Sequence, residues 1–285
     1  MTASLIRKPR ADDKRSVEQI VEHYTVEKQL ADRLRNASRE ERRTLYSSVY
    51  DELFQRLPHH PQHTQRASAR AVASQMRFVK RFLRPESTFL EVGPGDCALS
   101  FAVAQRVKHV YAVDVSDEIT RTRTVPGNFT LALSDGCSVP VPPGTVDVAF
   151  SNQLMEHLHP DDASEQLHNL YRALAPGGVY ACLTPNRLTG PHDISRYFRN
   201  VAEGLHLKEY SLRELRALLR NVGFSRVIQY VGKQWLYLRF PLPLTLALEH
   251  TLEALPPRVA GSVAGTLPVR AVLAIRVVAF KGAGS

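Results

Sequence analysis

The sequence predicts an α/β fold in which helices cover both faces of a mostly parallel sheet, with a helical extension at the amino end. Two observations support this prediction. After Pro85, short apolar runs alternate with polar turns and helical stripes, which is typical of β-α units in a parallel sheet. Before Pro85, apolar residues recur at the spacing of amphipathic helices. The expected strands span residues 88–92, 109–113, 129–133, 146–150, 179–183, 226–231 and 271–280.

The composition is that of a globular protein. The 285 residues are 44% hydrophobic and 23% charged, so the chain can bury a core and extensive disorder is disfavoured. No uninterrupted apolar stretch reaches the roughly eighteen residues of a membrane-spanning helix, and residues 1–15 lack the apolar core of a signal peptide. We therefore expect a cytoplasmic protein without a transmembrane segment, whose cysteines at positions 97, 137 and 182 are reduced thiols.

The basic charge of the chain is dispersed along the sequence. A formal net charge of +9 would suit an anionic partner if the lysines and arginines were clustered. The densest charged run, residues 39–43, reads REERR and mixes both signs, which is typical of a solvated helix face. An ordinary basic surface is therefore favoured over a nucleic-acid or anionic-membrane partner.

Three amphipathic helices are expected in the amino-terminal part. Apolar stripes at residues 17–24 and 72–83 indicate the first and third helices, and an S-x-x-E capping box at Ser38 begins the second. The first residues are polar and carry no pattern. We expect residues 1–15 to be a flexible terminus and residues 16–85 to form a helical cap.

The remaining residues, 86–285, are predicted to form one domain with a helical insertion. The insertion, at about residues 233–268, separates the last two strands and carries leucines at helical spacing between positions 244 and 255. Its polar face lacks the basic residues typical of a membrane-surface helix. We therefore expect it to pack against the domain or the amino-terminal helices.

Chemistry is expected where the first three strands end. The first strand runs through EVGPGD, residues 91–96, directly into a helix, and such a glycine turn can hold part of a nucleotide cofactor. Asp114 ends the second strand, nineteen residues beyond Gly95, where a carboxylate can accept hydrogen bonds from both ribose hydroxyls of an adenosine. Asp135, after the third strand, can accept a bond from the adenine amine. Each aspartate could instead cap a helix or form a turn.

The order of several motifs gives the chain a specific resemblance to a known family. The chain resembles the class I S-adenosylmethionine-dependent methyltransferases, particularly those acting on small molecules, in the runs LEVGPGDCALS, YAVDVS, SDG, VDVAFSNQLMEHL, LYRALAPGGVYACLTPNR and EYSLRELRALLRNVGF. The resemblance covers roughly residues 86–232. It implies a Rossmann-like, seven-stranded sheet that the strand at residues 271–280 completes.

The resemblance also implies S-adenosylmethionine as the cofactor. The binding residues that it implies are Glu91, Gly93 and Gly95 around the methionine portion, Asp114 at the ribose, Asp135 and Gly136 at the adenine, and Asn152 and Gln153 after the fourth strand. One position departs from the pattern, because Cys97 stands where the family has the third glycine of E-x-G-x-G-x-G. This departure puts the local backbone path in question.

A nicotinamide-dependent oxidoreductase is the strongest competing interpretation. The run Gly93-x-Gly95-x-x-Ala98 also satisfies the dinucleotide fingerprint, with Asp114 near the expected distance. However, Asp96 lies at the start of the helix, where its carboxylate would oppose a pyrophosphate. S-adenosylmethionine instead carries a sulfonium and an ammonium, which suit acidic surroundings. A third hypothesis is a non-catalytic protein that keeps the fold and binds a partner.

The catalytic residues are expected among histidines near the carboxyl edge of the sheet. Methyl transfer from a sulfonium is an in-line displacement, so the protein mainly aligns the acceptor with the methyl carbon. If the acceptor is a hydroxyl group, a base assists by removing its proton. The candidate bases are His157, His192 and His206, with Glu156 and Asp193 as possible partners, and no metal site is expected.

The acceptor is expected to be a small molecule methylated on oxygen, with nitrogen or carbon as alternatives. Residues 151–154 read SNQL and lack the D/N-P-P-Y/F arrangement of the amino-group methyltransferases that act on nucleic-acid bases. By analogy with other members of the family, the helical cap would cover the acceptor and exclude water.

Overall fold

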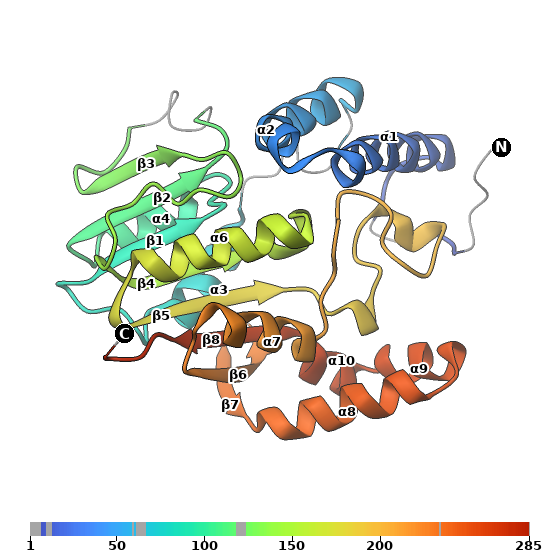
Figure 1. Cartoon of the computed structure of the whole chain (residues 1–285). Coiled ribbons are helices and arrows are strands. Elements are labelled where there is room, and N and C mark those ends of the chain that lie inside the picture. The colour runs from blue at the N-terminus through green and yellow to red at the C-terminus, as the bar shows by residue number, and fades with distance from the viewer. Residues whose placement is uncertain are drawn as a thin grey trace.

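A mixed sheet forms the centre of the part of the chain that the structure describes (Figure 1). The predicted flexible terminus, residues 1–15, lies partly outside this part. Two of its described residues contact Tyr197. The Arg7 backbone N–H donates to the Tyr197 carbonyl oxygen at 3.3 Å, and the Tyr197 hydroxyl donates to Asp13 Oδ2 at 2.8 Å. The computed structural model describes residues 7–9, 13–58, 60, 67–117, 124–233 and 235–284.

The described strands pair in the order β3-β2-β1-β4-β5-β8-β6-β7. Strands β1 to β5 pair in parallel, β8 runs antiparallel to β5 and β6, and β7 runs antiparallel to β6. This arrangement confirms the predicted α/β class and the mostly parallel sheet. The strands are β1 (Thr88–Val92), β2 (His109–Asp114), β3 (Phe129–Leu133), β4 (Val146–Asn152), β5 (Leu174–Thr184), β6 (Arg226–Lys233), β7 (Leu236–Phe240) and β8 (Ile275–Phe280).

The last strand begins later than predicted. Residues 271–273 end helix α10 (Leu267–Leu273), and β8 starts only at Ile275. A short apolar run fits a helix and a strand equally well by pattern alone. Here a proline in the first turn and the burial of Leu273 against Leu252 favour the helix.

The prediction of seven strands was wrong by one, because a strand lies inside the predicted helical insertion. Strand β7 pairs with β6 as a hairpin. Gly232 permits this hairpin, since its φ is +129° and a Cβ there would lie 1.9 Å from the Leu236 carbonyl oxygen. The leucines further along the insertion have helical spacing and predicted a helix for the whole segment. A strand of only five residues was therefore missed.

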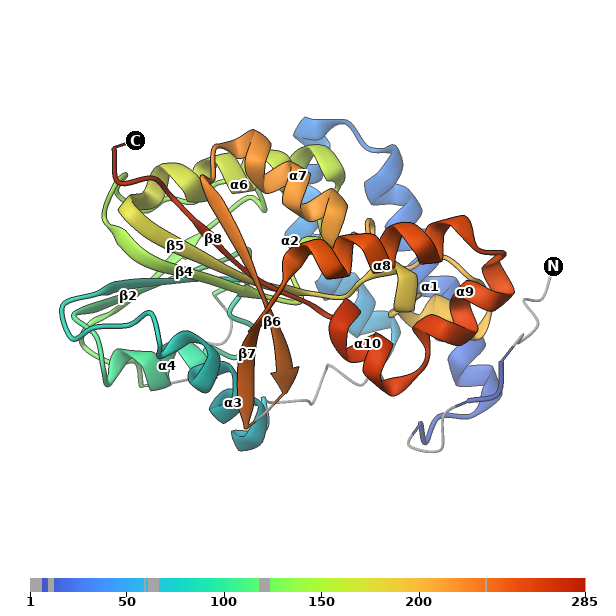
Figure 2. The same ribbon diagram turned by 90° about the horizontal axis from the view of Figure 1, so that it is seen from below.

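Helices cover the two faces of the sheet (Figure 2). Helices α6 and α7 lie on one face, where Leu167 and Leu215 join the larger hydrophobic core. Helices α3 and α4 lie on the other face, where Phe78 packs with Phe89. Part of the predicted amino-terminal cap, α3, thus packs against the sheet. The helices are α3 (Ala69–Val79), α4 (Ala98–Ala104), α6 (Pro160–Ala173) and α7 (Leu212–Val222).

Helices α1 (Val17–Asn36) and α2 (Arg39–Arg56) lie near the carboxyl ends of the parallel strands (Figure 1). Both begin with a capping box, in which Ser16 and Ser38 each accept a bond from the backbone N–H three residues later. Their apolar faces join the core that α6 shares with the sheet. These helices confirm the predicted helical extension.

A buried ion pair fixes α2 to α6. Arg42 donates from Nε and Nη2 to the two carboxylate oxygens of Asp162, at 2.5 and 2.8 Å, and the Tyr46 hydroxyl donates to Asp162 Oδ2 at 2.7 Å. The side chains of Arg42 and Asp162 are 4% and 0% exposed. Burial alone would raise the pKa of Asp162, but the Arg42 guanidinium holds that pKa below its ordinary value. We call Arg42, Tyr46 and Asp162 the cap joint.

The insertion packs against the start of α7. It contains α8 (Leu242–Ala254), α9 (Pro257–Ala264) and α10. The buried Glu249 accepts hydrogen bonds from the backbone N–H groups of Leu212 at 2.7 Å and Arg213 at 2.9 Å. A carboxylate at a helix amino terminus is favoured by the helix dipole, so this contact ties α8 to α7.

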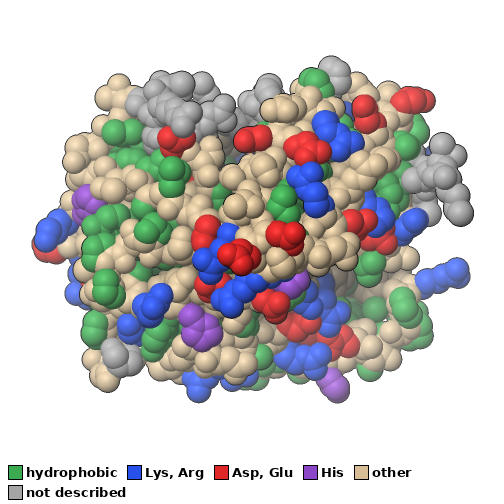
Figure 3. Space-filling model, turned by 45° about the horizontal axis from the view of Figure 1, so that its top comes forward, with side chains coloured by type: hydrophobic (Ala, Val, Ile, Leu, Met, Phe, Trp, Pro, Cys, Tyr) green, Lys and Arg blue, Asp and Glu red, His purple; other side chains and the backbone are tan. Residues whose placement is uncertain are grey.

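The surface carries both signs of charge. On the face seen in Figure 3, Lys and Arg side chains are interspersed with Asp and Glu side chains, as the sequence pattern indicated. Within the described ranges, none of the helices combines the length and apolarity needed to cross a membrane.

Removal of Asp162 tests the cap joint. We expect Asp162→Ala to lower the free energy of unfolding by about 3–5 kcal/mol, because the Arg42 guanidinium would stay buried without its partner. Asp161→Ala is the matched control on the same turn of α6, since the Asp161 side chain is 75% exposed and its loss should leave stability nearly unchanged. Urea unfolding followed by circular dichroism measures both variants. Equal losses in the two variants would contradict this account.

Candidate functional site

The turn that contains Gly93 and Gly95 follows β1 and lies at the carboxyl edge of the sheet. Gly93 and Gly95 have φ values of +67° and +55°, which glycine adopts without strain. The Gly93 N–H donates to the Val113 carbonyl oxygen at 2.9 Å, which holds the turn beside the end of β2. A Cβ on Gly93 would lie 3.0 Å from Leu154 Cδ1, so the turn is also packed against the segment after β4.

Cys97 keeps the backbone path that a glycine would give. Its φ is 56° and its ψ is 13°, in the left-handed region, and it directly precedes α4. Its side chain is buried. A non-glycine residue in this conformation carries a strain of roughly 1–2 kcal/mol. The departure from the family pattern therefore costs strain but leaves the turn in place.

Two predicted carboxylates lie at the ends of β1 and β2. Glu91 is buried and accepts a hydrogen bond from the Ser100 hydroxyl at 2.5 Å. Burial raises the pKa of Glu91 to about 8. Asp114 accepts bonds from the backbone N–H groups of Val115 at 2.7 Å and Ser116 at 3.3 Å, and burial raises its pKa as well. Both carboxylates therefore favour a cationic or hydrogen-bond-donating ligand.

The Asp135 carboxylate is already engaged within its own turn and by α2. Its Oδ1 accepts from the backbone N–H groups of Cys137 and Ser138, at 3.0 and 2.7 Å, and its Oδ2 pairs with Arg43 at 3.0 Å. These bonds hold its pKa below the ordinary value, although burial opposes them. The neighbouring Gly136 has φ +91°.

Helix α2 packs directly on this turn. A Cβ on Gly136 would lie 2.5 Å from Cδ2 of Tyr46, so only glycine fits beneath that ring. The predicted residues after β4 lie near the same edge. Asn152 is half-buried, whereas Gln153 is exposed and has φ 55°, and its N–H donates to the Leu183 carbonyl oxygen at 2.8 Å.

A cavity of about 660 Å³ is lined by all three predicted histidines but by none of the predicted cofactor-binding residues. It lies between the amino-terminal helices and the segment from residue 192 to residue 206. Acidic and basic side chains both contribute to its wall. The residues that line the cavity include Arg15, His23, Glu27, Tyr50, His60, His157, His192, Asp193, Arg196 and His206.

His157 and His206 each use Nδ1 for a hydrogen bond. His157 Nδ1 donates to the Leu205 carbonyl oxygen at 3.0 Å, and burial lowers its pKa to about 3. His206 Nδ1 lies 2.7 Å from Glu209 Oε1. Burial alone would lower the pKa of His206, but Glu209 and other acidic neighbours raise it above the ordinary value. The two rings lie 4.8 Å apart between centroids.

His192 is bonded differently. Its Nε2 lies 3.0 Å from Thr189 Oγ1 and 3.2 Å from the Asn186 carbonyl oxygen, so the ring is tied to its own loop. Burial lowers its pKa. Its backbone N–H donates to Glu209 Oε1 at 2.7 Å, which links His192 to the carboxylate that also holds His206.

The amino-terminal helices contribute residues that sequence reasoning missed. Burial raises the pKa of Tyr50. The charges of Glu27, Glu156 and Asp114 raise this pKa further. His23 and Glu27 are hydrogen-bonded at 2.7 Å. The spacing of four between His23 and Glu27 was a visible signal, since it places both on one helix face.

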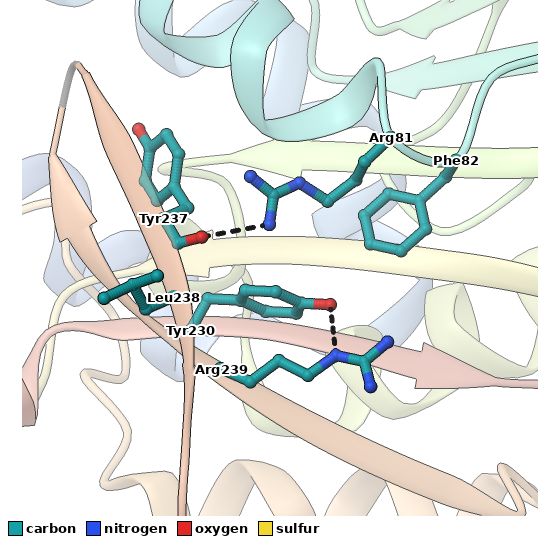
Figure 4. Close-up of a pocket in the computed structure, with 6 residues that line it drawn as sticks. All are labelled: Arg81, Phe82, Tyr230, Tyr237, Leu238 and Arg239. Carbon is teal, nitrogen blue, oxygen red and sulfur yellow. Dashed lines mark hydrogen bonds between the residues drawn. The ribbon is translucent and has the colours of Figure 1, made fainter.

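A smaller pocket of about 260 Å³ lies between α3 and the β6-β7 hairpin (Figure 4). Arg81 donates to the Tyr237 carbonyl oxygen at 3.2 Å, and Arg239 donates to the Tyr230 hydroxyl at 3.4 Å. None of the predicted site residues lines this pocket.

Comparison with known proteins shows that part of the chain is similar to methyltransferases. Residues 90–182 match the family model of the methyltransferase domain. A probable S-adenosylmethionine-dependent methyltransferase of Mycolicibacterium smegmatis is 28% identical over 137 residues, which cover 48% of this chain and 51% of that protein. Another, from Mycobacterium tuberculosis, is 27% identical over 139 residues and 48% of each chain. The matches thus span about half the length of these relatives.

A solved structure with the same fold extends the likeness beyond this region. It is a chain from the complex between the Haloferax volcanii Trm112 methyltransferase activator and a protein described there as a methyltransferase. Its identity is 18%, its TM-score is 0.53, and the alignment covers 75% of this chain and 90% of that chain. At this identity the likeness shows the fold alone. The family match and the relatives thus show that part of the chain, including residues 90–182, is similar to S-adenosylmethionine-dependent methyltransferases.

Proposed function

We propose that the whole protein transfers a methyl group from S-adenosylmethionine to an oxygen atom of a small molecule held in the histidine-lined cavity. One observation carries this proposal. The Tyr50 side chain lines the cavity, and the charges of both Asp114 and Glu156 raise its pKa, which supports a donor site near the cavity. A donor bound at Asp114 would therefore have its reactive end beside the acceptor.

The cofactor roles follow the order of the strand ends. Glu91, Gly93 and Gly95 would surround the methionine portion, and Asp114 would hold the ribose. Asp135 and Gly136 would face the adenine, and Asn152 and Gln153 would close the site after β4. The bonds of Asp135 to its own turn and to Arg43 support a role in fixing the shape of the adenine site.

The charge of the glycine turn disfavours the nicotinamide alternative. Asp96 Oδ1 accepts from the Ala98 N–H at 3.2 Å at the start of α4, where the pyrophosphate of a dinucleotide would bind. That carboxylate would repel the phosphates in a partly desolvated site. The sulfonium and ammonium of S-adenosylmethionine instead gain from the carboxylates at Glu91, Asp96 and Asp114.

The reaction needs alignment and a path for one proton. A lone pair on the acceptor oxygen forms the new O–CH₃ bond while the S–CH₃ bond breaks, and its electron pair stays on the now neutral sulfur. The hydroxyl proton passes from the acceptor to the imidazole of His157 or His206. We propose that His157 and His206 face the acceptor oxygen, and that His192, which is tied to its loop, positions Glu209 and thereby His206.

The cavity supports a polar small molecule as the acceptor. Its volume of about 660 Å³ lies within the usual range for small-molecule sites. Its wall carries carboxylates, guanidinium groups and imidazoles, which suit an acceptor with several hydroxyl groups. Helices α1 and α2 would cover this acceptor and exclude water. Nitrogen or carbon acceptors would appear as N- or C-methylated products in the same assays.

Ligand binding tests the donor. We expect S-adenosylmethionine and S-adenosylhomocysteine to raise the melting temperature, and NADH to leave it unchanged. Asp114→Ala should weaken S-adenosylhomocysteine binding about 30-fold or more by titration calorimetry, because hydrogen bonds to a carboxylate contribute about 1.5–3 kcal/mol each. Asp147→Ala is the matched control, since Asp147 accepts from the Thr88 N–H at the opposite ends of the strands.

Two outcomes would contradict the proposal. A response to NADH alone would favour the oxidoreductase, and no response to any of these ligands would favour a non-catalytic binding protein. With labelled S-adenosylmethionine and a panel of hydroxylated small molecules, the label should appear in O-methylated products of low mass.

The protonation of Glu91 predicts a pH dependence of donor binding. The pKa of about 8 means that the free protein holds Glu91 mostly protonated at pH 7, whereas the cationic donor favours the carboxylate. Affinity for S-adenosylmethionine should therefore rise between pH 6 and 7.5, by up to about tenfold per pH unit, with release of a proton. Calorimetry in buffers of different ionisation enthalpy measures this release. Glu91→Gln, an isostere of the protonated acid, should abolish it, and a release that persists in the variant would exclude Glu91 as its source.

A further inference from the structure

Three side chains, two of which line the histidine-lined cavity, form a compact group of possible nitrogen and oxygen ligands. Glu156 and His157 come from the turn after β4, and His206 comes from the segment before α7. One possible ligand atom from each lies within 4.8 Å of those of the other two. We call Glu156, His157 and His206 the β4 triad.

One oxygen of the triad is buried without a partner. Glu156 is 0% exposed, and its Oε2 accepts from the Thr184 hydroxyl at 2.8 Å. Its Oε1 has no hydrogen-bond partner within the part of the chain that the structure describes. A buried carboxylate oxygen without a donor is costly, so the site favours a cation at this position.

The outer hydrogen bonds of the triad are those of metal ligands. His157 Nδ1 donates to the Leu205 carbonyl oxygen at 3.0 Å, and His206 Nδ1 is bonded to the Glu209 carboxylate at 2.7 Å. With Nδ1 committed to these partners, Nε2 of each ring carries the lone pair for a ligand. Metal-binding histidines are commonly oriented in this way, by a carbonyl or a carboxylate at the second nitrogen.

A second group in the cavity, His23, Glu27 and His60, has a different pattern. Its possible ligand atoms also lie within 4.8 Å of one another. However, His23 Nδ1 contacts the guanidinium of Arg15, which can only donate, so the proton of a neutral His23 lies on Nε2 and is donated to Glu27 Oε1. This hydrogen bond satisfies both groups, so His23 serves as a control and not as a ligand.

We propose that Glu156, His157 and His206 bind a divalent transition metal ion, for which Zn²⁺ and Co²⁺ are suitable probes. Two imidazoles and one carboxylate suit such ions better than Mg²⁺ or Ca²⁺, which prefer oxygen ligands. Three protein ligands leave an open coordination position, as in catalytic zinc sites. Because His157 and His206 line the cavity, this position faces the acceptor.

The role of the ion rests on the proposed function. An acceptor hydroxyl bound at the open position would be acidified, as metal-bound water is. Its proton would pass to water, and the resulting oxyanion would attack the methyl carbon with the bond changes described above. The two histidines would then act as ligands and the metal as the group that activates the acceptor.

Cobalt titration in the absence of any methyl donor tests the site. We expect the full chain, freed of metal by a chelator, to bind one Co²⁺ in this cavity and to show the visible absorption of a cobalt-histidine site. Glu156→Gln and His206→Gln should each weaken binding by about 100-fold or more, since loss of even an outer-shell partner costs 10–100-fold. His23→Gln, in the same cavity, should leave Co²⁺ affinity and spectrum unchanged.

Other results would overturn the inference. It fails if wild-type protein binds no Co²⁺, or if His23→Gln loses binding while both triad variants keep it. Circular dichroism verifies that each variant is folded, and the second triad variant decides the matter if the first does not fold. If the protein binds S-adenosylhomocysteine but not Co²⁺, the metal site is rejected and the proposed function stands. If it binds Co²⁺ but neither S-adenosylmethionine nor S-adenosylhomocysteine, the proposed function is rejected and the metal site stands.

Discussion

The attachment of α2 to α6 determines how the histidine-lined cavity is enclosed. The buried pair between Arg42 and Asp162, joined by the Tyr46 hydroxyl, links the amino-terminal helices to the sheet domain. It keeps α1 and α2 at the carboxyl edge, with Tyr46 on Gly136 and Tyr50 on the cavity wall. Without this attachment, the cavity would lose the wall that α1 and α2 provide through residues such as Glu27 and Tyr50.

The buried carboxyl groups of the candidate site favour a cationic ligand. Burial raises the pKa of Glu91 to about 8 and that of Glu156 to about 7, and it also raises the pKa of Asp114. Each of these groups is more stable beside positive charge than alone. The chain as a whole carries a formal net charge of +9, whereas these three groups are acidic. That contrast suits a sulfonium donor, and at the β4 triad it suits a metal ion.

The sequence predicted those features that follow from local patterns. Strand-turn-helix alternation and glycine spacing predicted the sheet and the turn at Gly93 and Gly95, and capping boxes predicted the amino-terminal helices. The hairpin strand β7 and helix α10 were missed, since short apolar segments fit either conformation and only packing decides between them. Tertiary contacts were also invisible. Neither the effect of the Asp114 charge on Tyr50 nor the proximity of Glu156 to His206 could be predicted, because these residues are distant in the chain.

The central claim is that carboxylates at successive strand ends hold the donor with its methyl group directed at the histidine-lined cavity. A crystal structure with S-adenosylhomocysteine tests this claim most directly. The account predicts both ribose hydroxyls on the Asp114 carboxylate, the amino acid portion beside Glu91 and Gly93, and the sulfur facing His157. A ligand bound elsewhere, or a ribose that leaves Asp114 uncontacted, would contradict it.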